Sequence, residues 1–197
     1  MTFKLGLTGS IGMGKSTTAQ MFRDEGCEVW DADAAVHRVY AAGGGAVGLM
    51  RAAFPQAIVD GAVDRGALKT IIAGDPTALK TIETIVHPLL KQDRADFLAN
   101  ATADILVYDI PLLFETGGNA GMDAVACVSV DAETQEARVL ARGTMTAEQF
   151  QMIREKQMPD AEKRARADYV IVTDTLEHAR AQVQNIVSTI RAGLHNA

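Results

Sequence analysis

Apolar residues dominate five short stretches of the chain, and few polar residues interrupt the apolar run within each stretch. These stretches cover residues 3–8, 28–31, 105–110, 124–130 and 169–173. Continuous apolar runs of this length are typical of strands that helices cover on both faces, as in a parallel sheet. Helix-compatible stretches separate them, so the pattern predicts βαβ crossovers and a doubly wound, three-layer α/β/α fold with a five-stranded parallel sheet.

A long insertion follows the second predicted strand. About seventy residues separate this strand from the third, far more than a crossover requires. The patterns predict helices over 34–53, 64–74 and 75–100, with Asp75 as the N-cap of the last. An insertion of this kind suits a substrate-binding subdomain added to the sheet.

A second, shorter insertion lies between the fourth and fifth predicted strands. Its sequence pattern predicts helices over 132–142 and 146–157, and the second helix begins with a capping box from Thr146 to Gln149. A solvated helix face would explain its positive charge, but a basic hairpin next to a phosphate site also suits a lid that closes over a nucleotide. The basic residues of this region are Arg138, Arg142, Arg154, Lys156, Lys163, Arg164 and Arg166. A last helix is predicted over 175–192, capped by Asp174.

Composition narrows the class of protein. The chain has 197 residues, 48 % of them hydrophobic, and a net charge of -6, which argues against a broad nucleic-acid surface. No apolar stretch reaches the ~18 residues of a membrane span, and the N-terminus lacks the pattern of a signal peptide. Cys27 and Cys127 are too few for a disulfide framework, so we expect buried, reduced thiols and a cytoplasmic protein.

Residues 9–16 (GSIGMGKS) satisfy the phosphate-loop pattern G-x-x-x-x-G-K-[ST]. A predicted strand precedes them and a predicted helix follows, so that successive backbone N–H groups can surround an anion at the helix N-terminus. In this arrangement Lys15 reaches the β- and γ-phosphates, and the Ser16 hydroxyl ligates a magnesium ion. A glycine-rich turn without function is the alternative, but the strand–loop–helix context favours a nucleoside triphosphate site.

The phosphate loop identifies a class of proteins rather than a reaction. The chain contains neither the N-K-x-D nor the D-x-x-G motif of GTPase switches, and it has no basic channel for a nucleic-acid motor. A small-molecule kinase is therefore the leading interpretation. A kinase for another acceptor and a non-catalytic nucleotide-dependent regulatory module are the alternatives.

A small-molecule kinase needs a carboxylate that orients and deprotonates the acceptor hydroxyl. Asp31 and Asp33 follow the second predicted strand, and in extended geometry both side chains point the same way. Either this pair supplies the base, with Asp33 the better candidate, or it only forms a helix N-cap. Asp109, at the end of the third predicted strand, either holds magnesium or caps the turn into Pro111. His87, before a proline in a helical pattern, is more typical of a structural kink.

Taken together, these motifs resemble the dephospho-CoA kinase family nearly from end to end. The resemblance rests on residues 5–16 (LGLTGSIGMGKS), 31–33 (DAD), 63–68 (VDRGAL), 85–88 (IVHP) and 109–115 (DIPLLFE), and on Gln135, Arg138, Arg142, Gln157 and 167–168 in the second insertion. The phosphate loop alone is widespread, but this ordered set is specific.

The resemblance implies transfer of the γ-phosphoryl group of ATP to the ribose 3′-hydroxyl of dephospho-CoA, the last step of coenzyme A biosynthesis. It implies a nucleotide-binding core (1–33, 101–131 and 167–197), an acceptor subdomain (34–100) and a lid (132–166). ATP and Mg²⁺ are the implied ligands besides dephospho-CoA, with no nucleic-acid or membrane partner, and the chain is expected to be a monomer, with an oligomer left open.

The resemblance also assigns residues. It implies Asp33, Lys15 and Arg142 as catalytic residues and Ser16 as a metal ligand. It also implies Asp33, Arg65 and His87 as the acceptor site, and residues 9–17 (Gly9, Ser10, Ile11, Gly12, Met13, Gly14, Lys15, Ser16 and Thr17) with Arg138 and Arg142 as the ATP site. Asp109 is expected as a second metal ligand from its position at the end of the third predicted strand. The chain departs from the family at residues 173–175 (TDT), where an asparagine is usual, so the resemblance assigns no adenine-binding role there.

Overall fold

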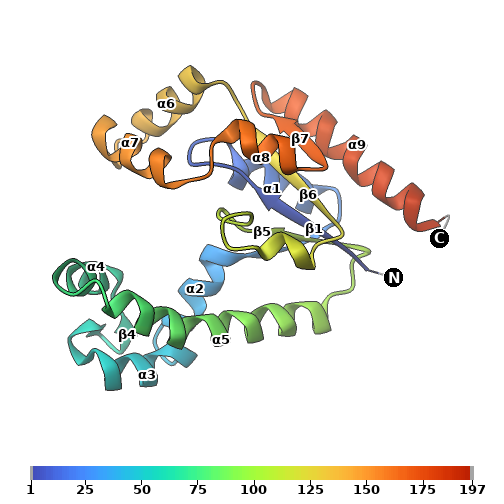
Figure 1. Ribbon diagram of the computed structural model, residues 1–197. Coiled ribbons are helices and arrows are strands. Elements are labelled where there is room, and N and C mark those ends of the chain that lie inside the picture. The colour runs from blue at the N-terminus through green and yellow to red at the C-terminus, as the bar shows by residue number, and fades with distance from the viewer. Residues whose placement is uncertain (1, 196–197) are drawn as a thin grey trace. The chain divides into compact units, whose positions relative to one another are not determined.

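The computed structural model describes residues 2–195 and divides into two compact units (Figure 1). The first, here called the sheet unit, extends to Trp30 and resumes at Ala101. The second, here called the helical unit, is the continuous segment Asp31–Asn100. Each is described by itself below.

The sheet unit holds the phosphate loop between a central strand and a helix. Its elements are β1 (Phe3–Thr8), α1 (Lys15–Asp24), β2 (Glu28–Asp31, whose last residue starts the helical unit), β5 (Ile105–Asp109), η2 (Gly118–Gly121), β6 (Ala124–Ser129), α6 (Ala132–Ala141), α7 (Ala147–Lys156), α8 (Asp160–Arg166), β7 (Tyr169–Val172) and α9 (Leu176–His195). The strand order is β2-β5-β1-β6-β7, which confirms the predicted five-stranded parallel sheet. The register sets Leu7 of β1 beside Asp109 of β5.

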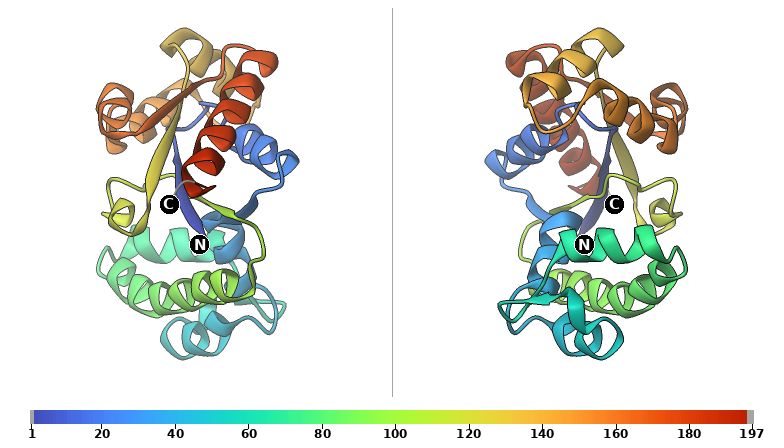
Figure 2. Two further views of the ribbon diagram at one scale, coloured as in Figure 1. Left: turned by 90° about the vertical axis from the view of Figure 1, so that its right-hand side faces the viewer. Right: turned by 90° about the vertical axis from the view of Figure 1, so that its left-hand side faces the viewer.

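Helices cover this sheet on both faces. Figure 2 shows α1 and α9 side by side against it, where their apolar faces pack on buried side chains such as Leu5, Val107 and Val128. Helix α8 packs on β6, where Val125 joins a smaller cluster with Leu113. At β2, the Trp30 ring lies 6.2 Å from the ring of Tyr108, and both are buried. The three-layer prediction is confirmed.

The helical unit has a hydrophobic core of its own. Its elements are α2 (Ala32–Tyr40), α3 (Gly45–Ala53), η1 (Pro55–Ala57), β3 (Ile58–Val59), β4 (Ala62–Val63), α4 (Arg65–Gly74) and α5 (Ala78–Asn100). The core contains Val39, Tyr40, Ala46, Val47, Met50, Ala57, Val63, Leu68, Ile82 and Val86. Pro88 lies within α5, as the helical pattern around it predicted.

Several local predictions were wrong. The Asp75 carboxylate accepts from the amide and hydroxyl of Thr77, so it forms a turn, and α5 begins only at Ala78. The amide of His178 donates to the Thr175 hydroxyl, so Thr175 rather than Asp174 caps α9. The short hairpin β3–β4 and helix α8 were missed. The Asp60-Gly61 pair in the sequence could have indicated the hairpin, because Asp-Gly is typical of tight two-residue turns. In the structure the two residues have positive φ angles of 49° and 79°, as such a turn requires.

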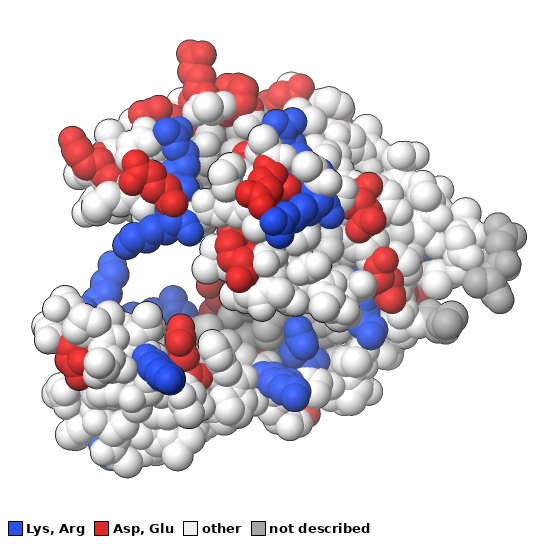
Figure 3. All heavy atoms as spheres, in the orientation of Figure 1, with Lys and Arg blue, Asp and Glu red and all other residues white. Residues whose placement is uncertain are grey.

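Charges of both signs are mixed on the face of each unit that Figure 3 displays. Lysine and arginine side chains there alternate with aspartate and glutamate, without a broad basic area. Among the helices of residues 2–195, none is long and apolar enough to cross a membrane.

Candidate active site

The phosphate loop has the backbone geometry of an anion site. Gly12 and Gly14 have φ angles of 79° and 89°, a region that favours glycine. A Cβ atom at Gly12 would lie 2.5 Å from a methyl carbon of Val139, so only glycine fits. Gly14 is the N-cap of α1 and provides no side-chain hydrogen bond. The first amides of α1 are therefore open to an anion, and the helix dipole favours its negative charge.

Lys15 and Asp109 meet at the carboxyl edge of the sheet. The Lys15 ammonium group forms an ion pair with Oδ1 of Asp109, whose side chain is 2 % exposed. This contact places Asp109 at the phosphate loop, where a metal-binding carboxylate was expected. Ser16 and Thr17, in the first turn of α1, are exposed. Among the described residues, no group of three or more His, Cys, Asp and Glu side chains could hold a metal ion.

A pocket of about 240 Å³ opens beside the phosphate loop. It is lined by Gly14, Thr17, Thr18, Met21, Arg138, Arg142, Thr173, Asp174, Thr175, Leu176 and Ala179. The two predicted lid arginines therefore line one pocket with Thr17. Leu176, whose side chain is 64 % exposed, provides apolar surface there.

Thr173, where the chain departs from the family pattern, lines this pocket and hydrogen-bonds to both Met13 and Arg138. Its hydroxyl donates to the Met13 carbonyl oxygen at 2.8 Å. Arg138 donates to the Thr173 hydroxyl at 3.1 Å and to its carbonyl oxygen at 2.6 Å. Thr173 therefore connects Arg138 of α6 to the phosphate loop, a contact that sequence reasoning missed.

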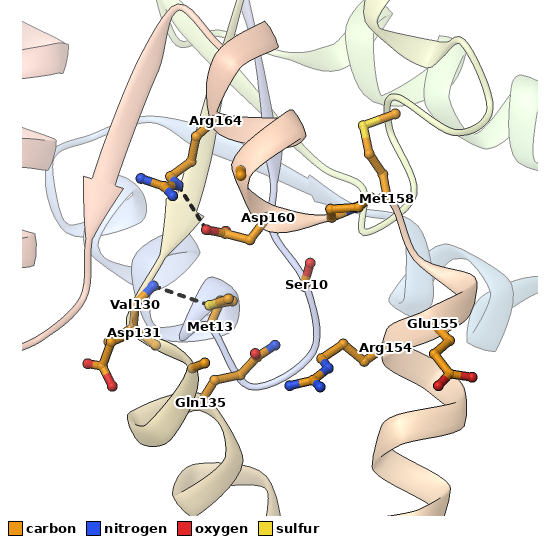
Figure 4. Close-up of a pocket in the computed structure, with 13 residues that line it drawn as sticks. Ser10, Met13, Val130, Asp131, Gln135, Arg154, Glu155, Met158, Asp160 and Arg164 are labelled. Carbon is orange, nitrogen blue, oxygen red and sulfur yellow. Dashed lines mark hydrogen bonds and ion pairs between the residues drawn. The ribbon is translucent and has the colours of Figure 1, made fainter.

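A second cavity of about 490 Å³ borders the phosphate loop at Ser10 and Met13 (Figure 4). Its other walls come from residues 130–135, 154–161 and Arg164. Asp160 accepts from the Ser129 hydroxyl and from Arg164, each at 2.8 Å, through Oδ2. Its Oδ1 atom is buried without a hydrogen-bond partner.

A buried lysine joins α8 to the loop that follows β5. Lys163, expected among the basic lid residues, is fully buried, and its ammonium group donates to the Pro111 carbonyl oxygen and to Glu115, each at 2.9 Å. Burial alone would raise the pKa of Glu115, but hydrogen bonds from Lys163 and from the Met158 amide outweigh it and lower that pKa. Lys163 thus fixes α8 to the loop that follows β5, and its side chain is not exposed to solvent.

The helical unit contains the predicted acceptor residues. The Asp31 carboxylate accepts from the Ala34 amide at 2.9 Å and caps α2, while Asp33 lies exposed in the first turn of that helix. The expectation that both carboxylates point the same way from an extended strand was therefore wrong, because β2 ends at Asp31. Arg65 is exposed and lies over the Tyr40 ring, 6.0 Å from its centre, and His87 is exposed on α5.

Comparisons with known proteins agree with this geometry. The family model of dephospho-CoA kinase matches residues 3–178. A dephospho-CoA kinase of Ruegeria pomeroyi is 74 % identical over 193 residues, which cover 98 % of both chains. One from Cereibacter sphaeroides is 59 % identical and covers 96 % of each. A crystal structure from Thermus thermophilus, 32 % identical, superposes with a TM-score of 0.86 over 95 % of this chain and 97 % of that one. The chain belongs to the dephospho-CoA kinase family.

Proposed function

We propose that this chain transfers the γ-phosphoryl group of ATP to the ribose 3′-hydroxyl of dephospho-CoA, with the residues assigned below. One observation carries the assignment: a phosphate loop opens the uncapped helix α1, and its Lys15 pairs with the strand-end carboxylate of Asp109. Membership of the family supplies the reaction.

Phosphate binding is assigned to the loop and to Lys15. Backbone N–H groups of the loop hold the β- and γ-phosphates, and Lys15 exchanges Asp109 for a phosphate oxygen when ATP binds. The Ser16 hydroxyl and the Asp109 carboxylate would hold Mg²⁺. Two hard oxygen donors suit this ion, which keeps most of its waters and takes further ligands from substrate phosphates. Bound there, Mg²⁺ would neutralise charge that develops on the phosphoryl oxygens.

Asp33 is assigned as the general base. Asp31 is engaged in capping α2, whereas Asp33 is exposed two residues later and follows a strand that ends at the carboxyl edge of the sheet. The Asp33 carboxylate takes the proton of the 3′-hydroxyl as that oxygen bonds to the γ-phosphorus. The bond from the γ-phosphorus to the bridging oxygen breaks, and ADP leaves with its electron pair.

The remaining assignments concern the two ligands. We assign the pocket beside Thr17 to the nucleoside of ATP, with Arg142 stabilising charge on the phosphoryl group in transfer and Arg138 supporting the pocket through Thr173. Arg65 and His87, both exposed in the helical unit, are assigned to acceptor binding.

Asp33→Asn tests the base. We expect an unchanged Kd for ATP and a fall in the rate of phosphoryl transfer of about 10²- to 10⁴-fold, because the amide cannot accept the proton. Asp31→Asn is the matched control, since asparagine caps a helix as well as aspartate does, and it should leave the rate nearly unchanged. Undiminished turnover by Asp33→Asn would reject the assignment.

The acceptor is tested separately. ADP release is measured with dephospho-CoA and with nucleosides and small carboxylic acids in its place, and we expect dephospho-CoA to be far the fastest. A faster reaction with another acceptor would reject the proposed substrate and leave a different small-molecule kinase.

A further inference from the structure

Two glutamines from the second insertion hold the phosphate loop at one residue. Nε2 of Gln135 donates to the Ile11 carbonyl oxygen at 2.7 Å, and the Ile11 amide donates to Oε1 of Gln157 at 3.2 Å. Gln135 lies in the first turn of α6, and Gln157 is the residue at which α7 ends. Both hydrogen-bonding groups of the Ile11 backbone are therefore satisfied by side chains from the two ends of the α6–α7 hairpin.

The surroundings make this contact a rigid one. Gln135 is 3 % exposed, and Figure 4 shows its side chain extending from α6 toward the phosphate loop. On the far side of Gly12, the Met13 carbonyl oxygen accepts from the Thr173 hydroxyl. Gly12, whose φ of 79° lies in the left-handed region, is thus flanked by two residues that side chains fix in place. A glycine loop without such contacts would sample many conformations, and binding a phosphate would have to order it.

We propose that Gln135 and Gln157 are positioning residues for ATP: they hold the phosphate loop in its binding conformation through Ile11 and thereby link that loop to both ends of the lid. The proposal rests on the proposed function, because it requires that ATP binds at this loop. A side-chain amide can fix either backbone group because it has both a donor and an acceptor. Gln135 uses its NH₂ group to donate to the Ile11 carbonyl oxygen, and Gln157 uses its carbonyl oxygen to accept from the Ile11 amide.

The first test removes each hydrogen bond separately. Gln157→Ala removes the acceptor, and Gln135→Met removes the donor while it keeps most of the buried volume. We expect each variant to raise the Kd for ATP, measured by titration without acceptor, about 3- to 10-fold, which is the net value of one neutral hydrogen bond. The KM for ATP should rise with it and kcat should change less than twofold, because neither glutamine touches the reacting atoms.

Gln182 provides a matched control. It holds both backbone groups of one residue in the same way, with Val172 at 3.0 Å and 2.9 Å, but on the strand β7 at the edge of the sheet. Gln182→Ala should lower the melting temperature and leave the Kd for ATP unchanged. An equal rise in Kd for Gln182→Ala would overturn the proposal, because loss of stability alone would then explain the effect.

Two glutamate variants form a second test with matched charge. Gln157→Glu keeps an acceptor for the Ile11 amide, whereas Gln135→Glu loses the donor and sets a carboxylate against the Ile11 carbonyl oxygen. We expect Gln135→Glu to bind ATP at least fivefold more weakly than Gln157→Glu, because only Gln135→Glu loses a hydrogen bond, and the ratio follows from the net free energy of one such bond. Equal affinities would overturn the proposal. If the unaltered chain does not bind ATP, the proposed function fails; if it binds ATP and all the glutamine variants bind equally well, only this inference fails.

Discussion

Lys15 and Asp109 are 94 positions apart in the sequence and form an ion pair at the carboxyl edge of the sheet. The strand order explains the contact, since β1 and β5 are neighbours and Asp109 lies beside Leu7, shortly before the phosphate loop. The side chains of Lys15 and Asp109 are 15 % and 2 % exposed. Asp109 thus holds the lysine at the loop and offsets its positive charge.

Replacing Asp109 tests this relationship. Asp109→Asn removes the charge that holds Lys15 and a proposed ligand of Mg²⁺, so we expect kcat to fall about 10²- to 10³-fold. The Mg²⁺ concentration for half-maximal activity should also rise. Steady-state kinetics over a Mg²⁺ titration measure both quantities.

Asp104→Asn is the control for this prediction. Asp104 precedes the same strand at its amino end and pairs with Arg191 through two contacts of 2.8 Å and 3.1 Å. Its loss should leave the Mg²⁺ requirement unchanged. A normal Mg²⁺ requirement in Asp109→Asn would contradict the metal assignment.

The buried pair of Lys163 and Glu115 predicts a large effect on stability. Glu115→Gln leaves a buried ammonium group without its counter-charge, so we expect the free energy of unfolding to fall by about 3 kcal/mol. Glu162→Gln, which breaks the exposed ion pair with Arg166 on the same helix, should cost less than about 1 kcal/mol. Urea unfolding of both variants makes the comparison, and equal losses would show that burial does not strengthen the pair.

The lowered pKa of Glu115 predicts how this effect depends on pH. A carboxyl group with a lowered pKa stabilises the folded chain above its unfolded value, ordinarily 4.5, and the contribution disappears as pH falls through the folded pKa. The stability difference between the natural chain and Glu115→Gln should therefore be constant near pH 7 and shrink below about pH 4.5. Unfolding curves at pH 7, 5, 4 and 3 test this, and a difference independent of pH would contradict it.

Arg138 and Arg142, the two predicted lid arginines, should respond differently to substitution. Arg142 is exposed where α6 ends, so Arg142→Ala should mainly lower kcat, by about 10²-fold. Arg138 is fixed on Thr173, so Arg138→Ala should mainly raise the KM for ATP, about 3- to 10-fold. Kinetics at varied ATP separate the two effects, and an identical pattern for both variants would argue against distinct roles.

The cysteines should be unreactive in the folded chain. Burial raises the pKa of Cys27 to about 11 and that of Cys127 to about 12, so almost no thiolate is present near neutral pH. Both thiols are free and buried, as the sequence predicted. Iodoacetamide at pH 8 should modify neither residue before unfolding and both in urea, which mass spectrometry can determine. Rapid labelling of the folded chain would contradict the burial.

Local patterns in the sequence predicted the sheet and the phosphate loop. Each of the five strands was expected within one residue of its observed end, because buried strands are continuous apolar runs, and the capping box from Thr146 to Gln149 was also confirmed. The D-A-D motif was ambiguous because aspartate is typical both of a helix N-cap and of a general base. The structure shows that Asp31 caps α2, and the catalytic role of Asp33 stays a prediction.

Contacts between distant segments could not be predicted in this way. Gln157 meets Ile11 across 146 positions, and Lys163 meets Pro111 across 52. Nothing in the local pattern distinguishes a lysine that is buried from the exposed arginines beside it. The family resemblance placed Gln157 in register, but the partner of its side chain emerges only when the chain is folded.

Trp30 has a practical consequence, since it is the single tryptophan of the chain. It is 5 % exposed, near the Tyr108 ring and immediately before Asp31. Its indole is therefore shielded from water in the native chain and should emit at shorter wavelength than in urea. The molecule has an intrinsic fluorophore at β2, immediately before the D-A-D segment, so unfolding of this strand can be followed optically without any label.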